Sequence, residues 1–206
     1  MRFRGKILLI GTLLAISTFV HPAESTDNVK NRIPDVLGFV EWVVLKDTSL
    51  RLKSRLDTGA RTSSLHAVNV EPFEKDDQEW VRFQIPLGDH DDQPTEGTLE
   101  HEDVILKFER PVERTVLIKR KGAPSQRRYV VRMEFCIAGT IHETQFSLAD
   151  RGRFSYPVLL GRRFMGDDEI LVDSSDSFLA EQECHSASLE DLAQRNEGRI
   201  VDEPDK

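Results

Sequence analysis

Leu56-Asp57-Thr58-Gly59-Ala60 is the stretch that decides the fold, because an apolar segment runs directly into an acid, a hydroxyl and a glycine. Leu52 precedes it and the small polar run Thr62-Ser63-Ser64 follows it. Gly59 allows backbone conformations that a side chain would forbid, so a tight turn here can hold the Asp57 carboxylate toward a cleft. Asp57 is therefore the first candidate for acid-base chemistry, although the same three residues also occur as a plain Asx-type turn after a strand.

A second informative stretch lies far downstream, where Tyr156-Pro157-Val158-Leu159-Leu160-Gly161-Arg162 ends an apolar segment in glycine and arginine. Together the two stretches resemble the retropepsin-like aspartic peptidases, in which Asp-Thr-Gly-Ala ends one strand and an apolar-apolar-Gly strand packs behind it. The runs at 57–67 and 156–164, with Arg128-Tyr129-Val130 between them, look more closely like a bacterial family often labelled ATP-dependent zinc proteases. This resemblance extends over residues 38–179.

The resemblance implies an all-β, retropepsin-like closed β-barrel over residues 37–181, with one short helix after the Gly-Arg strand. Residues 182–206 are expected to form a polar C-terminal tail with a short helix, since Ser188 and Asp191 make a capping-box-like start at 189–195. Short runs rich in apolar, β-branched and aromatic residues independently favour an all-β barrel or sandwich. They lie at 38–44, 50–56, 68–70, 80–85, 104–108, 115–118, 129–135, 144–148 and 170–173.

The same resemblance assigns catalytic roles to the first motif. Asp57 would supply a carboxylate, Thr58 would hydrogen-bond across a dimer axis, and Gly59 would let a peptide substrate approach the backbone. Hydrolysis of an amide by carboxylates needs two of them, one ionised to activate water and one protonated to polarise the carbonyl. The chain has a single Asp-Thr-Gly, and Asp173-Ser174-Ser175 lacks the glycine. We therefore expect a homodimer in which a second copy supplies the second carboxylate.

Substrate binding is expected from the residues that flank these positions. Gly161 would allow close packing beneath the Asp turn. Retroviral enzymes carry an acid shortly after Asp-Thr-Gly-Ala that pairs with the arginine of the Gly-Arg strand, whereas this chain has Arg61 next. Arg162 therefore needs another partner, and Arg61 is a candidate for binding a substrate carboxylate. The substrate-binding candidates are Ala60, Arg61, Gly161 and Arg162.

Zinc is the alternative cofactor, whereas the aspartic mechanism needs none. A zinc site needs about three ligands and an open position, but the histidines are scattered, and Phe146 stands where a helical His-Glu-x-x-His site beginning at His142 needs its second ligand. His66, close after the Asp turn, is the best ligand candidate, so a zinc-dependent peptidase or amide hydrolase remains an alternative. No Gly-rich loop followed by Lys-Ser or Lys-Thr supports ATP binding.

A third class of function is a non-catalytic β-barrel that binds a peptide or protein and uses the Asp turn only for folding. Retained biological effect of an Asp57→Ala protein would favour this class. The formal net charge of −8 argues against nucleic acid as a partner. The length of 206 residues, with 38% hydrophobic residues, fits a single core.

The N-terminal residues have the layout of a secretory signal. Arg2, Arg4 and Lys6 precede an apolar run at 7–20, which is shorter than the roughly 20 residues of a spanning helix. Residues 1–23 are therefore predicted to be a signal peptide or an N-terminal anchor, followed by a linker at 24–36. This pattern predicts a periplasmic or otherwise exported protein, with membrane association through the N-terminus if the segment is not cleaved.

Two further features of the sequence are a pair of cysteines and a polar loop. Cys136 and Cys184 are too few for a disulfide scaffold; they can pair in an oxidising compartment, or Cys136 can be a small core residue. Residues 86–97 are polar and acidic, which predicts a mobile surface loop. Because this loop lies about 30 residues beyond Asp57, as in the resembling enzymes, we expect 88–97 to act as a flap over the site.

Overall fold

Residues 35–120 and 122–196 are described by the structure, a computed structural model. They form an all-β fold with one short helix directly after the Gly-Arg strand, which confirms the predicted fold class. The predicted signal peptide or anchor and residues 24–34 of the predicted linker lie outside the described residues. Within the described part, no helix is long and apolar enough to cross a membrane.

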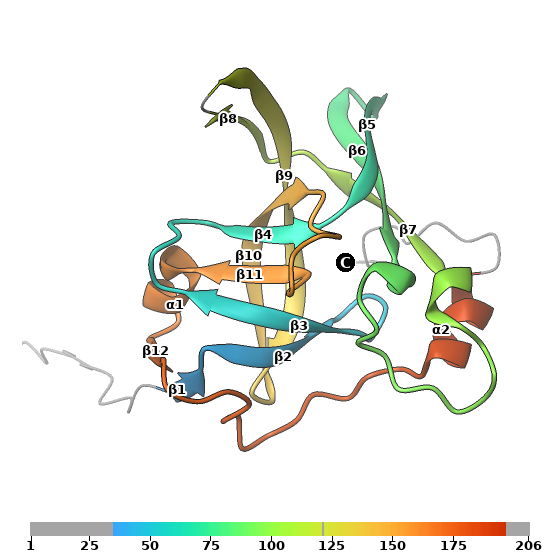
Figure 1. The fold of residues 1–206 in the computed structure, drawn as a ribbon. Helices are drawn as coiled ribbons and strands as arrows, with labels where there is room; N and C mark the ends of the chain where they lie inside the picture. The colour runs from blue at the N-terminus through green and yellow to red at the C-terminus, as the bar shows by residue number, and fades with distance from the viewer. Residues whose placement is uncertain (1–34, 121, 197–206) are drawn as a thin grey trace, which may run out of the picture. The chain divides into compact units, whose positions relative to one another are not determined.

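The main sheet closes on itself (Figure 1). Its strands follow the order β10-β4-β11-β3-β2-β9-β8, and β9 also pairs with β10, so that six strands form a ring of pairings. The strands of the ring are β2 (Val40–Leu45), β3 (Leu50–Asp57), β4 (Ser63–His66), β9 (Ala123–Ile137), β10 (Thr140–Ala149) and β11 (Val158–Gly161).

The Asp turn follows directly from the residue pattern of β3. Leu50, Leu52, Ser54 and Leu56 are buried and alternate with more exposed residues, as expected for a strand with one face on the core. Asp57 is the last residue of this strand and pairs with Gly161 of the parallel strand β11. The ring therefore brings both sequence motifs to one end of two neighbouring strands.

Two smaller sheets complete the fold. One contains β5 (Val68–Lys75), β6 (Gln78–Pro86) and β7 (Ile105–Pro111), and Phe83 stacks on Phe108 at its core with ring centroids 5.2 Å apart. The other is a parallel pair of β1 (Asp35–Gly38) and β12 (Ile170–Asp173). Helix α1 (Arg162–Asp167) lies between β11 and β12 in the chain. Figure 1 shows α1, β1 and β12 at the same end of the ring as the C-terminal ends of β3 and β11.

A long hairpin extends beyond the ring. It consists of β8 (Arg114–Arg120) and the first part of β9, and Figure 1 shows it as an arm that leaves the rest of the sheet. Gly122 at its turn has a φ of +74°, a left-handed conformation that suits glycine. Leu117 on β8 is 66% exposed. We call residues 114–132 the basic hairpin, because their sequence contains seven Lys or Arg residues and no acidic residue.

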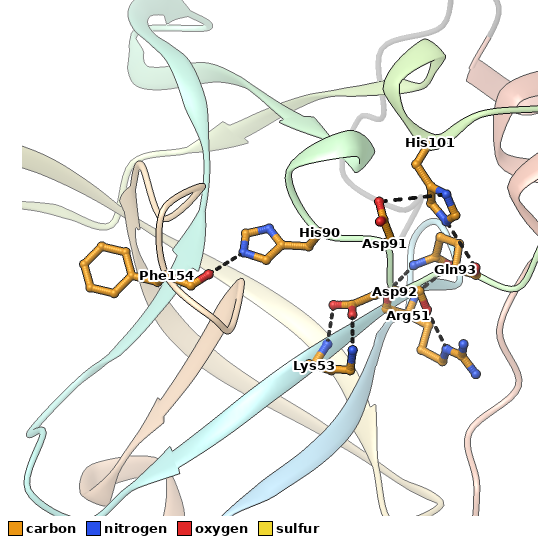
Figure 2. Close-up of polar contacts among 8 residues, drawn as sticks. All are labelled: Arg51, Lys53, His90, Asp91, Asp92, Gln93, His101 and Phe154. Atoms are coloured by element: carbon orange, nitrogen blue, oxygen red, sulfur yellow. Dashed lines mark hydrogen bonds and ion pairs between the residues drawn. The ribbon is translucent and has the colours of Figure 1, made fainter.

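Part of the loop at 88–97 is buried, whereas its composition predicts a mobile surface loop. Asp92 and Gln93 are buried, and both bind β3 (Figure 2). The Asp92 carboxylate accepts a hydrogen bond from the Lys53 backbone N–H at 2.8 Å and pairs with Lys53 Nζ at 3.2 Å. Gln93 exchanges hydrogen bonds with the backbone of Arg51. Composition does not indicate these two buried positions, because polar residues can be buried where a neighbouring strand satisfies their polar groups.

The loop is further fixed by two short 3₁₀ helices and by its histidines. These helices are η1 (Leu87–Asp89) and η2 (His101–Asp103). His90 Nε2 lies 3.0 Å from the Phe154 carbonyl oxygen, and His101 Nε2 lies 3.2 Å from the Gln93 carbonyl oxygen (Figure 2). A flap at this position would have to break contacts with both β3 and the segment before β11.

The C-terminal segment packs onto the same core. Helix α2 (Leu189–Asn196) buries Leu189 and Leu192, and Ser188 Oγ accepts the Asp191 backbone N–H at 3.2 Å, the cap that the sequence suggested. Cys136 and Cys184 form a disulfide, which joins this segment to β9. The segment is therefore held at several points along its length.

Candidate active site

The Asp57 carboxylate is held by its own turn. Its Oδ1 accepts the backbone N–H of Gly59 at 2.9 Å and that of Ala60 at 3.1 Å. Asp57 is half-buried, whereas Thr58 and Gly59 are exposed. A Cβ atom at Gly59 would stand 3.1 Å from Asp57 Oδ1. The turn therefore fixes one carboxylate oxygen of Asp57 and leaves the neighbouring residues Thr58 and Gly59 exposed.

The Gly-Arg strand supports this turn from behind. A Cβ atom at Gly161 would lie 2.6 Å from the carbonyl carbon of Thr62, a distance that requires glycine. The backbone N–H of Arg162 donates to the Ala60 carbonyl oxygen at 2.9 Å, and its Nη1 donates to the Gly59 carbonyl oxygen at 2.9 Å. The backbone carbonyl of Gly59 thus takes the place of the acid that Arg162 lacks in the sequence.

The two remaining binding candidates lie on the same turn. Ala60 is half-buried. Its N–H donates to Asp57 Oδ1, and its carbonyl oxygen accepts the Arg162 N–H. The Arg61 side chain is exposed, and its carbonyl oxygen accepts the Arg163 N–H at 3.2 Å. Asp57, Thr58, Gly59, Ala60, Arg61, Gly161 and Arg162 are therefore all brought together at one end of β3 and β11.

His66 is part of a buried hydrogen-bonded chain. It is fully buried, its Nδ1 accepts the Arg151 backbone N–H at 2.9 Å, and its Nε2 lies 2.8 Å from Asp89 Oδ2. Burial lowers the pKa of His66 below its ordinary value, although the hydrogen bond to Asp89 opposes this shift. A neutral ring that accepts at Nδ1 must donate from Nε2 to Asp89, so both ring nitrogens of this zinc-ligand candidate are already engaged.

The other histidines described above have partners within the fold. The ring of His90 meets that of His66 edge-on, with centroids 5.2 Å apart. His142 Nδ1 lies 2.8 Å from Asp168 Oδ1, just after α1. Among residues 35–120 and 122–196, no group of three or more His, Cys, Asp or Glu side chains is arranged so that it could hold a metal ion. The geometry of the described residues thus offers no ready zinc site.

Arg151 is a residue of the site that sequence reasoning missed. It is 8% exposed, its Nη1 donates to Ser64 Oγ at 3.0 Å, and its Nε donates to the Tyr156 carbonyl oxygen at 3.0 Å. Burial lowers its pKa, the positive charge of Arg128 lowers it further, and the negative charge of Asp57 acts in the opposite direction. Arg151 occurs in a polar run without any motif, so its burial next to β4 left no signal in the sequence.

Phe154 was also not singled out from the sequence. Its ring is 58% exposed, and the Arg151 guanidinium carbon lies 4.8 Å from the ring centroid. Its carbonyl oxygen is the partner of His90 described above. An exposed aromatic ring on an anchored segment just before β11 is a candidate contact for an apolar part of a ligand.

The closed ring, the supported Asp-Thr-Gly turn and the paired Gly-Arg strand define a retropepsin-like aspartic peptidase fold. Residues 36–183 match the family described as RimB-like, the retropepsin-like aspartic endopeptidase RimB. The chain belongs to this RimB-like family, which confirms the resemblance inferred from the sequence.

Curated relatives carry a different name. A probable alpha-L-glutamate ligase of Shewanella pealeana is 33% identical over 144 residues, which cover 69% of this chain and 29% of the relative. A protein of the same name from Desulfotalea psychrophila is 31% identical over 67% of this chain and 28% of the relative. The chain thus spans less than a third of the length of these relatives.

A solved structure shares the fold and part of the sequence. It is the crystal structure of a Legionella pneumophila protein with unknown function (DUF785), which is 31% identical to this chain. The alignment has a TM-score of 0.57 and covers 71% of this chain and 98% of that chain.

Proposed function

We propose that the protein is an exported aspartic endopeptidase whose active site forms in a homodimer. The observation that carries the proposal is the Asp57 carboxylate, which is held by two backbone N–H groups on a turn whose Thr58 and Gly59 are exposed. A single Asp-Thr-Gly supplies one carboxylate, and the reaction needs two. An exposed turn leaves room for the Asp57 of a second copy.

The end of the ring that carries Asp57 offers a surface for this dimer. Val36 of β1 and Leu171 of β12 are 54% and 55% exposed, and both strands lie at this end of the ring (Figure 1). Apolar side chains at this level of exposure on a two-stranded sheet favour association with another protein surface. We expect the β1–β12 sheet to pack against its copy beside the two Asp turns.

The reaction that we propose needs no metal. Two carboxylates brought together cannot both ionise easily, so they share a proton and titrate as a coupled pair. One Asp57 accepts a proton from water, which attacks the peptide carbonyl carbon. The other Asp57 donates its proton to the carbonyl oxygen, which gives a neutral tetrahedral intermediate. The first Asp57 then passes the proton taken from water to the amide nitrogen, and the C–N bond breaks. The second Asp57 recovers a proton from the intermediate, so that a carboxylic acid and an amine leave and the dyad is restored.

We further propose that the substrate is an acidic, glutamate-rich peptide. Arg61 is exposed beside the catalytic turn, and the hairpin that extends from the ring is basic. The relatives that contain a domain like this one are named for a reaction of α-L-glutamate. A peptidase with cationic side chains around its site would stabilise substrate carboxylates in the bound state.

The basic hairpin is the better candidate for the flap. It extends from the ring, whereas the loop at 88–97 is fixed to β3 through Asp92 and Gln93. A mobile cover must open for the substrate and close to exclude water.

The experiment that tests the proposal is cleavage of glutamate-rich and neutral peptides by metal-free wild-type protein and by Asp57→Asn. We expect cleavage of the glutamate-rich peptide by wild type and none by Asp57→Asn. Asp191→Asn, at an exposed carboxylate of α2, serves as a control that keeps activity. Activity that disappears with the metal and returns with Zn²⁺ would favour the zinc alternative. Peptide binding without any cleavage would favour the non-catalytic barrel.

A further inference from the structure

A groove separates the base of the basic hairpin from the edge of the second sheet. It has a volume of about 360 Å³ and is lined by the start of β5, the first half of β9 and the end of β10. Figure 1 shows the β5–β6 and β8–β9 hairpins extending from the same side of the ring. The groove is lined by residues of both hairpins. We call it the β5–β9 groove. Its central lining residues are Val68, Asn69, Val70, Arg127, Arg128 and Tyr129.

Arg127 and Arg128 make one wall of the groove basic, within a segment that is itself basic. Residues 114–133 contain no acidic residue, on a chain with a formal net charge of −8. The only acidic residue among the described lining residues is Asp150, whose carboxylate accepts the Gly152 backbone N–H at 3.1 Å. The local charge therefore favours an anionic occupant. The basic residues of this segment are Arg114, Lys119, Arg120, Lys121, Arg127, Arg128 and Arg132.

The opposite wall presents backbone groups. The β5–β6 ladder shifts register between Val68 and Glu71, and Asn69 has a left-handed φ of 50°. Such a bulge leaves backbone groups outside the ladder and turns the strand. β5 is also an edge strand, since it pairs only with β6 in the described part of the chain. An extended peptide can hydrogen-bond to backbone groups of this kind.

The groove and the catalytic turn lie at opposite ends of the short strand β4. Ala67, directly after β4, lines the groove, whereas the Asp57 turn leads into Ser63 at the start of this strand. Arg151 links the two places, since it follows Asp150 of the groove lining and its Nη1 donates to Ser64 Oγ at 3.0 Å. An extended peptide of ten residues spans roughly 33 Å, which is long enough to reach from the turn into the groove.

We propose that the β5–β9 groove binds an acidic, extended stretch of the peptide substrate that lies outside the cleaved bond. The inference rests on the proposed function, because it assigns the groove to the substrate of that reaction. The basic wall pairs with carboxylates of the peptide, and the bulge at Asn69 contacts its main chain. The groove then adds affinity for long acidic chains over short ones.

The test measures binding without turnover. Full-length Asp57→Asn protein is titrated into a fluorescein-labelled decaglutamate peptide, and fluorescence anisotropy gives the Kd. The variant Arg127→Glu reverses an exposed charge in the groove, and Arg195→Glu reverses an exposed charge on α2 as the matched control. Unlabelled decaglutamine competes as the neutral peptide.

We expect Arg127→Glu to weaken binding about fivefold and Arg195→Glu to leave the Kd within about twofold, the range of exposed charge pairs. Decaglutamine should not displace the label, and added salt should weaken binding. Equal affinity of the two variants, or displacement by decaglutamine, would overturn the assignment. The binding test is independent of cleavage, which is measured separately with Asp57 intact. If the protein binds in this way but never cleaves, the proposed function fails and the groove assignment stands. If the protein cleaves the peptide and Arg127→Glu changes neither cleavage nor binding, the groove assignment alone fails.

Discussion

The guanidinium of Arg162 donates to the carbonyl oxygen of Gly59 at 2.9 Å, across 103 residues of sequence. The bond ties Arg162, the first residue of α1, to Gly59, the last residue of the Asp-Thr-Gly motif. It therefore fixes the peptide plane between Gly59 and Ala60, and the Ala60 N–H in that plane binds Asp57 Oδ1. The orientation of the carboxylate therefore depends on a residue that lies far from it in the sequence.

Arg162→Met is expected to lower kcat about tenfold, roughly the effect of losing one hydrogen bond to a charged donor. The effect on KM should be smaller, because the turn and not the substrate loses its support. Arg163→Met is the control, since the Arg163 side chain is exposed and lies 3.9 Å from Asp167 in α1. Equal loss of kcat in both variants would show that Arg162 has no special role.

Gly161→Ala should destabilise the fold by about 1–3 kcal/mol, the usual cost of an overpacked site. The added methyl group would meet the Thr62 backbone, which cannot move without displacing the Asp turn. Gly166→Ala is the matched control, because its Cβ meets nothing within 4 Å and it lies inside α1. Thermal unfolding of both proteins measures the difference; a neutral Gly161→Ala would contradict the packing described here.

Asp92→Ala should destabilise the protein by about 1 kcal/mol, since the half-buried Lys53 N–H loses its acceptor. The kcat of the protein that remains folded should stay close to wild type, because we propose that the basic hairpin, and not the anchored loop at 88–97, acts as the flap. Shortening the turn at 119–124 should instead lower kcat without much loss of stability. Steady-state kinetics and unfolding curves of the two variants test this division, and the reverse pattern would restore the loop as the flap.

Cys136→Ser with Cys184→Ser should lower the free energy of unfolding by about 2–4 kcal/mol, as for a disulfide that closes a loop of this length. The bond spans 48 residues and holds the segment that leads to α2. A reducing agent should lower the Tm of wild type and leave that of the double variant unchanged. Identical Tm values under reducing and oxidising conditions would argue against the disulfide.

The stability of the protein should fall as the pH drops below about 6.5, the ordinary pKa of an unfolded histidine. Burial lowers the pKa of His66 in the folded state, so the unfolded state binds the proton more tightly. The stabilisation linked to His66 is therefore present above the unfolded pKa and is lost as the pH falls through the folded one. Protonation also removes the acceptor for the Arg151 N–H. Titration of His66 by NMR measures the pKa, and a value above that of an unfolded histidine would contradict the prediction.

The strands and the Asp turn could be predicted because they depend on local pattern. β3 is readable from the alternation of Leu50 and Leu52, and Gly59 and Gly161 mark the positions where backbone and strand approach closely. Contacts between distant segments were harder to predict. Asp92 reads as a surface acid until β3 lies beside it, and Arg151 reads as a loop residue until Ser64 lies beside it. The pairing of Cys136 with Cys184 likewise depends on a fold that two cysteines alone cannot specify.

The most direct test of the central claim is a mixing experiment between wild-type protein and Asp57→Asn. A mixed dimer contains one ionisable Asp57 and cannot form the dyad, so inactive chains should suppress the activity of active ones. With a ninefold excess of Asp57→Asn and full subunit exchange, we expect the cleavage rate to fall to about one tenth, the share of active chains that still find an active partner. An unchanged rate at the same wild-type concentration would contradict an active site shared by two copies of the chain.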